Sequence, residues 1–410
     1  MLKVVRVPRR LQNFFRPLRR YFTKPQWRHF QAVVLAAVIT FNRRNVSGLS
    51  RTIVEGSHRT KLNGFLISSP WDCEEVLQAK AYQLLETLNL KPGETIYLII
   101  DDSRNQKRGK KMAAVGKFKD PLTGHYIIGH NYVAGSLCCR GVTIPFAVKL
   151  YAKKEYCQNA KKEFKKTTEL AAEIVRSFQP PPNIKVIVLF DSYYMCKVVG
   201  RAIKERRFHF VSTLKVNRNI YCGRGQKRKV GSYGKNTYRR KIKVKVVVTE
   251  TGQRKVYWAV ESKVFLPGFG MVKVVFSKKK RQGKLLTIVS DDVTLSLKQI
   301  VRIYSYRWSI EVFFKNGKQN LGLGEYQTQN YDGVVRHLHL IFIAHSLLTH
   351  LQIEQRGAKG KKKKRVATIS MGGLQNQVRM IVLKDLIRYL YRKRKDRKRV
   401  EKLYRVFSVS

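Results

Sequence analysis

The stretch TIYLIIDDS at residues 95–103 ends a strongly apolar, β-branched run on two adjacent carboxylates. Such a run predicts a buried strand, here ending at Asp101 and Asp102. A second run, KVIVLF at residues 185–190, ends in the same way at Asp191. Each aspartate alone is more often a turn residue or helix cap. As a pair at the ends of central strands they would share one cleft and repel each other unless a cation lay between them, which favours a Mg²⁺ site.

Working outward from these two strands, the pattern predicts an α/β fold with a mixed sheet covered by helices. Three further strand-like runs follow the first strand, and a long helix is expected over residues 154–178, ended by a proline run. A helix over about 194–205 and a strand over 208–214 come after the second strand. Alternating apolar residues between 215 and 290 predict an inserted antiparallel β subdomain.

The charge of the chain points to a polyanionic partner. Its 410 residues include 84 Lys and Arg against 26 Asp and Glu, a net charge of +58. Self-repulsion of this size disfavours a compact state unless a polyanion neutralises it, and nucleic acid releases counterions when it does so. We expect DNA binding to be spread over residues 1–60, 215–245 and 356–400, the last containing a run of four lysines at 361–364.

The cysteines and the longest apolar stretches bear on the compartment. None of the six cysteines forms a C-x-x-C pair, which argues against a zinc ribbon and favours a reduced, cytosolic setting. The apolar stretches at 33–39 and 337–351 are each too short to cross a bilayer, so no membrane association is expected.

A third acid lies in the segment YSYRWSIEVFFKNGK at residues 304–318. On a continuous helix at about 100° per residue, four polar side chains fall on one narrow face: Tyr304, Arg307, Glu311 and Lys318. A purely structural alternative is that Glu311 forms an ion pair with Arg307 or Lys315 at helical spacing. Trp308 is expected to be a core residue rather than a platform for a base.

This segment resembles a known family. Its Tyr-x2-Arg-x3-Glu-x6-Lys spacing is that of one branch of bacterial insertion-sequence DDE transposases, whose fold is RNase H-like. Asp101 and Asp191 resemble the family's two aspartates, 90 residues apart, and Glu311 follows 120 residues later. The longer second gap is similar to the branch with a β insertion before the glutamate. Tyr193 departs from the pattern, which often has a small residue there.

The resemblance implies a set of roles. Asp101, Asp191 and Glu311 would be catalytic and hold Mg²⁺ or Mn²⁺, and Tyr304, Arg307 and Lys318 would bind DNA phosphates. Asp102 stays an alternative to Asp101, which is favoured because the family's aspartate usually stands two before a Thr or Ser, here Ser103. The implied activity is cleavage and strand transfer of double-stranded DNA at terminal inverted repeats and a target site. The implied assembly is a homodimer on DNA in the bacterial cytoplasm, at the nucleoid.

The expected domain plan divides the chain into five parts. They are a helical DNA-binding domain (1–91), a first RNase H-like part (92–214), the β insertion (215–290), a second RNase H-like part with the glutamate helix (291–352) and a basic helical C-terminal region (353–410). Two other function classes remain open: a non-mobile RNase H-like nuclease or domesticated transposase, and a non-catalytic basic nucleic-acid-binding protein.

Overall fold

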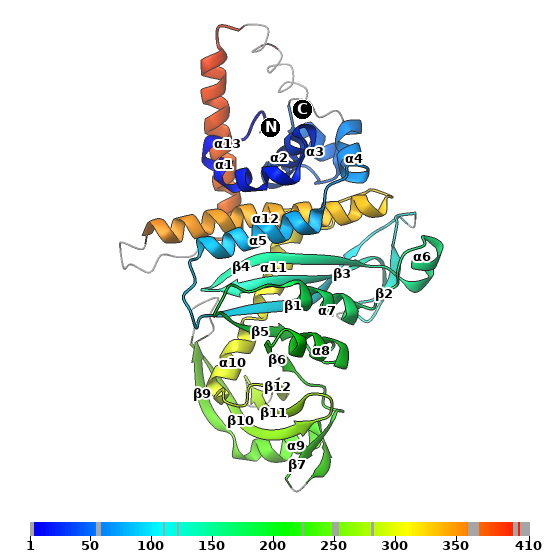
Figure 1. The fold of residues 1–410 in the computed structure, drawn as a ribbon, viewed down its shortest axis with the longest axis vertical. Helices are drawn as coiled ribbons and strands as arrows, with labels where there is room; N and C mark the ends of the chain where they lie inside the picture. Colours follow the sequence, from blue (N-terminus) through cyan, green and yellow to red (C-terminus); the bar gives the residue numbers. More distant parts are fainter. Residues whose placement is uncertain are drawn as a thin grey trace.

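A large mixed sheet with helices on both faces organises the computed structural model of the chain (Figure 1). The structure describes residues 4–54, 59–109, 111–120, 123–223, 225–247, 254–279, 283–359, 369–396 and 401. The lysine run at 361–364 lies outside these residues, as does part of the predicted basic region 356–400.

The helices and strands alternate in the order that the hydrophobic pattern predicted, apart from the differences given below. Before the sheet come α1 (Arg9–Phe15), η1 (Arg16–Tyr21), α2 (Lys24–Ile39), α3 (Val46–Thr52), α4 (Arg59–Ile67) and α5 (Cys73–Thr87). The first half of the sheet and its helices are β1 (Thr95–Gln106), β2 (Gly116–Lys119), β3 (Tyr126–Cys139), β4 (Val142–Tyr151), α6 (Lys154–Asn159), α7 (Thr167–Ser177), β5 (Lys185–Phe190), α8 (Lys197–Glu205) and β6 (His209–Thr213).

The second half of the chain contains the inserted strands and the last helices. They are β7 (Asn219–Cys222), β8 (Gln226–Lys229), α9 (Val230–Thr237), η2 (Tyr238–Arg240), β9 (Ile242–Val247), β10 (Arg254–Leu266), β11 (Gly270–Lys278), β12 (Leu286–Ser290), α10 (Leu297–Ser305), α11 (Trp308–Asn320), α12 (Tyr331–Lys359) and α13 (Met371–Lys393).

Strand β1 lies between β3 and β5 in the part of the sheet that carries the aspartates. It pairs antiparallel with β3, which pairs antiparallel with β4, and it pairs parallel with β5, which pairs parallel with β6. The resulting order β4-β3-β1-β5-β6 brings the two aspartate-bearing strands, β1 and β5, side by side. Parallel neighbours of this kind need a crossover, and α6 and α7 lie within it (Figure 1).

Two sequence predictions about these elements were wrong. The strand that carries Asp101 does not end there, because pairing with β3 continues to Gln106 while pairing with β5 stops at Ile99. The helix expected over 154–178 is two helices. Lys161 adopts a left-handed conformation (φ 50°) that ends the first, and the Glu169 carboxylate accepts a hydrogen bond from the Lys166 N–H (2.7 Å) at the start of the second.

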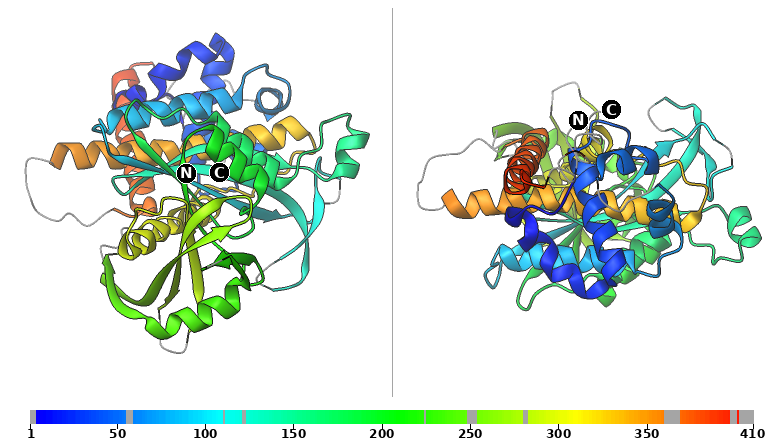
Figure 2. Two further views of the ribbon diagram at one scale, coloured as in Figure 1. Left: turned by 60° about the horizontal axis from the view of Figure 1, so that its bottom comes forward. Right: turned by 90° about the horizontal axis from the view of Figure 1, so that it is seen from above.

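The inserted strands extend the same sheet rather than forming a second one. β12 pairs antiparallel with β6, and β11, β10, β7 and β8 follow outward, with β9 also on β10. Figure 2 shows this part at the front of its left view, below the helices. The sheet is therefore continuous from the aspartate strands into the region between 215 and 290.

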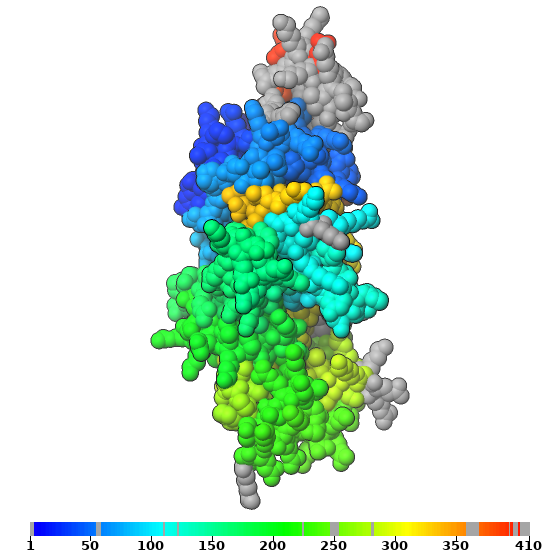
Figure 3. Space-filling view, turned by 90° about the vertical axis from the view of Figure 1, so that its right-hand side faces the viewer, coloured from blue at the N-terminus to red at the C-terminus, as the bar shows by residue number. Residues whose placement is uncertain are grey.

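Helices cover the two faces of the sheet in different ways. One face packs against α7 and α8, while the other packs against α10, α11 and α12. The N-terminal helices and α13 lie over α12 and α5 (Figure 2). We call these helices the N-terminal layer. Along the molecule, the N-terminal layer is followed by α12 and then by the sheet (Figure 3). α12 is long and apolar enough to cross a membrane, but 83% of its apolar window is buried inside the protein, where it is a central core helix.

Candidate active site

Asp101 and Asp191 lie on neighbouring strands at the point where these strands separate. The parallel register pairs Ile99 with Leu189, and continuing it by two residues sets Asp101 beside Asp191, immediately after β5. Burial raises the pKa of Asp101 to about 7, and repulsion from Asp102 and Asp191 adds to the shift while Arg307 opposes it. A carboxylate in this position is unstable as an anion without nearby positive charge.

Asp102 points to a different environment, because successive strand residues face opposite sides. Its carboxylate accepts a hydrogen bond from the Tyr194 hydroxyl (3.2 Å) and lies 3.6 Å from the Arg104 guanidinium. Tyr194 is fully buried against the face covered by α7 and α8. This orientation supports Asp101 as the residue that faces the glutamate helix. The sequence drew attention to the tyrosines after Asp191 but gave no means of foreseeing the Tyr194 contact.

The segment 304–318 is not one continuous helix, so the prediction of a single helix here was wrong, while the shared face of its four residues stays a prediction. α10 ends at Ser305 and α11 begins at Trp308. Backbone N–H groups around this junction bond three residues back instead of four, as from Arg307 to Tyr304 (3.1 Å). The ring of Tyr306 stacks on Tyr97 of β1 at 4.3 Å, which holds the junction above the strand that carries Asp101.

Helix α11 is seated by an apolar stripe at helical spacing. Ile310, Phe313, Phe314 and Gly317 are buried. A Cβ at Gly317 would lie only 2.9 Å from the Leu323 side chain, so this position keeps the helix close to the following loop. The stripe leaves Glu311 on a flank of the helix, 33% exposed, beside the junction.

Arg307 joins Glu311 to Asp101. One guanidinium nitrogen, Nη1, donates to Asp101 Oδ2 (3.0 Å), and the other, Nη2, donates to Glu311 Oε1. The guanidinium also lies 5.7 Å from the centre of the Tyr304 ring. The ion pair offered by helical spacing is thus present, but it is one arm of a bridge to a strand 206 residues away.

The other predicted residues are arranged less simply. Lys318 donates to the backbone oxygen of Arg104 (2.8 Å), and burial together with Arg104 lowers its pKa. The backbone N–H of Tyr193 donates to Asp191 Oδ1 (2.9 Å).

Within the described residues no three His, Cys, Asp or Glu side chains are grouped as a metal cage, so the convergence of Asp101, Asp191 and Glu311 on one ion stays a prediction. Trp308 is 57% exposed, and its assignment to the core was wrong because the junction turns it outward.

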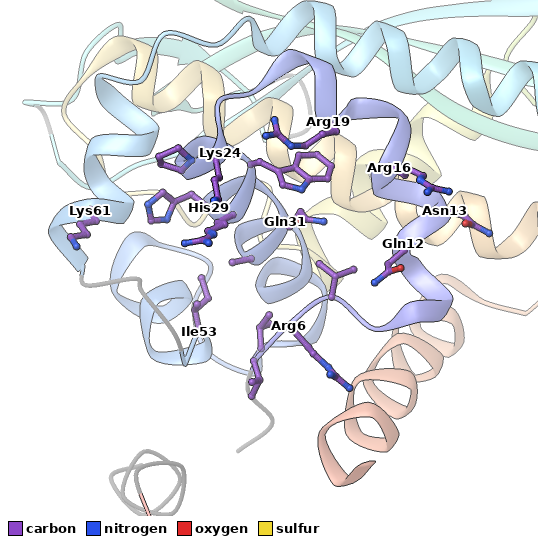
Figure 4. A pocket seen from close by; sticks show the side chains of 17 residues that line it. Arg6, Gln12, Asn13, Arg16, Arg19, Lys24, His29, Gln31, Ile53 and Lys61 are labelled. Carbon is purple, nitrogen blue, oxygen red and sulfur yellow. The ribbon is translucent and has the colours of Figure 1, made fainter. Parts of the chain in front are cut away.

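A separate basic groove lies in the N-terminal layer (Figure 4). It has a volume of about 1320 Å³ and is lined by the N-terminal segment, α1, η1, α2 and Lys61 of α4. The cationic residues that line it are Arg6, Arg16, Arg19, Lys24, Arg28 and Lys61. Arg6 is tied to Asp385 of α13 (2.7 Å), whereas Arg16, Lys24 and Arg28 pair with no carboxylate in the described part of the chain.

Comparison with known proteins identifies the family of the chain. A family model described as "DDE superfamily endonuclease" matches residues 17–262, which include Asp101 and Asp191 and end before Glu311. The chain belongs to this family of endonucleases. It is also 27% identical, over 175 residues, to a probable transposase for insertion sequence element IS701 from Microchaete diplosiphon. That similarity covers 42% of this chain and 44% of the relative, so the chain spans less than half of the relative's length.

Proposed function

We propose that this protein is a DNA transposase that cleaves the ends of an insertion sequence and joins them to target DNA. The observation that carries the proposal is the meeting of Asp101, beside Asp191, with the Arg307–Glu311 pair inside a DDE-family chain. The strand order β4-β3-β1-β5-β6, with three antiparallel strands followed by two parallel ones, supports an RNase H-like core. The distant similarity to a probable transposase supports mobility rather than simple hydrolysis.

The residues at the cleft suit a divalent metal, Mg²⁺ or Mn²⁺. Asp101 is a largely buried carboxylate repelled by its neighbours, and Mg²⁺ is usually held by only one or two carboxylates together with water and substrate phosphate. Bound there, such ions would supply activation of the attacking oxygen and stabilisation of the leaving oxygen. Asp101, Asp191 and Glu311 are the proposed ligands.

The remaining residues of the segment would position DNA. Arg307 can present parallel N–H donors to a phosphate, a geometry that a lysine lacks. Lys318 and Tyr304 lie on either side of it along the chain and would contact neighbouring phosphates. These residues would orient the strand so that the reacting phosphodiester faces Asp101 and Asp191.

Double-stranded DNA is the proposed partner, both as terminal inverted repeats and as target. The basic groove supports recognition of the element's ends by the N-terminal helices, separately from the cleft. We further propose a homodimer that holds two ends, acting in the bacterial cytoplasm at the nucleoid. A nuclease without strand transfer remains the second candidate, because the matching family is defined by endonuclease activity.

The test uses the sequence that flanks the coding region as substrate. Purified protein with Mg²⁺ should nick or cut a plasmid carrying both flanks and insert the cut fragment into a second plasmid. Asp191→Ala and Glu311→Ala should each abolish cleavage while leaving DNA binding intact, and Glu205→Ala, at an exposed surface pair with Arg176, is the matched control. Full cleavage by either active-site variant would show that the proposed catalytic roles of Asp191 and Glu311 are wrong. Cleavage without insertion identifies the nuclease alternative.

A further inference from the structure

The Arg307 guanidinium lies between two carboxylates that the proposed function assigns to metal binding. Each terminal nitrogen is committed to one of them, Asp101 on β1 and Glu311 on α11. The side chains of Arg307 and Asp101 are 17% and 18% exposed, so this bridge is largely shielded from water. A positive charge of the protein's own therefore already balances the carboxylates from which the cation site is proposed to be built.

The surroundings of Arg307 allow it to change partners. It stands at the junction of α10 and α11, where three-residue backbone hydrogen bonds replace the regular helical pattern, a feature often found at hinges. Its Nε is buried and has no hydrogen-bond partner among the described residues. An arginine with an unused donor can accommodate a further acceptor such as a phosphate oxygen.

The two carboxylates, by contrast, are held in place. Asp101 lies in a strand that is still paired with β3 at this position, opposite Ala134. Glu311 lies in the first turn of α11, whose buried stripe fixes the helix against the core. The movable member of the bridge is therefore the arginine, on a long side chain beside a helix junction.

We propose that Arg307 is an internal counter-ion that DNA displaces, so that DNA and metal bind cooperatively. In the free protein the guanidinium occupies Asp101 and Glu311 and repels a divalent cation at short range. When a DNA phosphate enters the cleft, the guanidinium transfers to it and the two carboxylates become available. By linkage, the duplex must raise metal affinity by the same factor by which metal raises duplex affinity. This proposal rests on the proposed function and concerns the order in which its components assemble.

The experiment measures Mn²⁺ binding to the full-length protein by electron paramagnetic resonance, with and without a short duplex from the flanking sequence. Mn²⁺ binding to the duplex alone is subtracted. In the wild type, the duplex should tighten Mn²⁺ binding by about tenfold, within the usual range for coupled sites. Arg307→Met should bind Mn²⁺ about as tightly without DNA as the wild type does with it, and the duplex should add nothing further.

Two more variants keep the result interpretable. Arg302→Met removes an exposed positive charge from α10, five residues earlier in the chain, and should leave the coupling unchanged. Arg307→Lys preserves charge and folding but cannot bridge both carboxylates, so it should show intermediate coupling. The inference is overturned if the duplex leaves wild-type Mn²⁺ affinity unchanged, or if Arg307→Met and Arg307→Lys both behave like Arg302→Met. The proposed function has a separate readout in the cleavage and insertion assay: it fails if Asp191→Ala or Glu311→Ala still cleaves, or if the wild type cleaves without insertion.

Discussion

The cleft and the base of the N-terminal layer each contain a largely buried ionisable group whose pKa is shifted, and these two groups are of opposite sign. In the cleft, burial and like charges raise the pKa of Asp101 to about 7. In the N-terminal layer, burial lowers the pKa of Lys80 on α5 to about 7. Both groups are therefore strained as ions at neutral pH, and both lie against elements that are distant in the chain.

The difference is in their partners. Asp101 faces another charged group, Arg307, in a cleft where a second cation is proposed to bind. Lys80 faces neutral groups: it donates to the backbone oxygen of Phe14 and to Gln83 Oε1 (2.8 Å), and lies 4.2 Å from the centre of the Phe14 ring. Burying a charge at a similar cost in free energy can therefore serve two different purposes. Asp101 is the residue proposed to bind metal, whereas Lys80 joins α5 to α1 through the Phe14 backbone oxygen.

The sharpest test of this comparison is Asp101→Asn. Cleavage should fall by about a thousandfold or more, because a proposed metal ligand is lost. The folded-state pKa is raised, so ionisation of Asp101 lowers stability increasingly from about pH 4 to pH 7 and by a constant amount above. Asparagine avoids that cost. We expect urea unfolding of metal-free protein at pH 8 to show a gain of roughly 2–4 kcal/mol, vanishing near pH 4. A loss of stability at pH 8 contradicts the account of the cleft.

Lys80→Met tests the other half. The folded-state pKa of Lys80 is lowered, so protonation destabilises the folded protein and wild-type stability should rise between about pH 7 and pH 10. Methionine removes this dependence. At pH 7 the free energy of unfolding of the variant should be higher by roughly 2–4 kcal/mol, minus the contribution of the hydrogen bonds that Lys80 made. This advantage should fade toward pH 10. Unlike Asp101→Asn, it should retain cleavage. A stability advantage that does not depend on pH would contradict the lowered pKa of Lys80.

The basic groove provides a smaller effect. Replacing Arg16, Lys24 and Arg28 together by alanine removes three cations that pair with no carboxylate in the described part of the chain, and should weaken duplex binding about tenfold at physiological salt. The slope of log affinity against log salt should become shallower by about 2.7, at roughly 0.9 per phosphate contact. Cleavage at saturating DNA should persist. The matched control replaces Lys204, Lys263 and Lys298, which are exposed and lie outside the groove and outside the three predicted DNA-binding regions. Equal losses in both triple variants would mean that the groove adds nothing beyond net charge.

Trp308→Ala should have the smallest effect on stability. Because the indole is 57% exposed, the free energy of unfolding should change by less than about 0.5 kcal/mol. Chemical unfolding monitored by circular dichroism measures this. A loss of several kcal/mol would instead indicate that the Trp308 indole is buried in the core, as its helical pattern suggested.

Much of the sheet could be predicted from local pattern. The apolar runs before Asp101 and Asp191 are strands β1 and β5, and the break into antiparallel strands after 215 is present. The failures lie where tertiary pairing overrides local signals. β1 continues past its acids because β3 offers a partner. The helical pattern at 304–318 is interrupted at the junction where Tyr306 stacks on Tyr97 of a distant strand.

The sequence by itself predicted a polyanionic partner, through a net charge of +58. Its spaced aspartates, with the Tyr, Arg, Glu and Lys of residues 304–318, resembled the DDE family, and the family match confirms membership in the DDE endonucleases. Only the tertiary structure decided that Asp101 rather than Asp102 faces the glutamate helix, and that Arg307 bridges Asp101 to Glu311. Periodicity reports which side of its own element a residue occupies. A contact between residues 206 positions apart depends instead on strand register and on how α11 packs over β1, which no local pattern encodes.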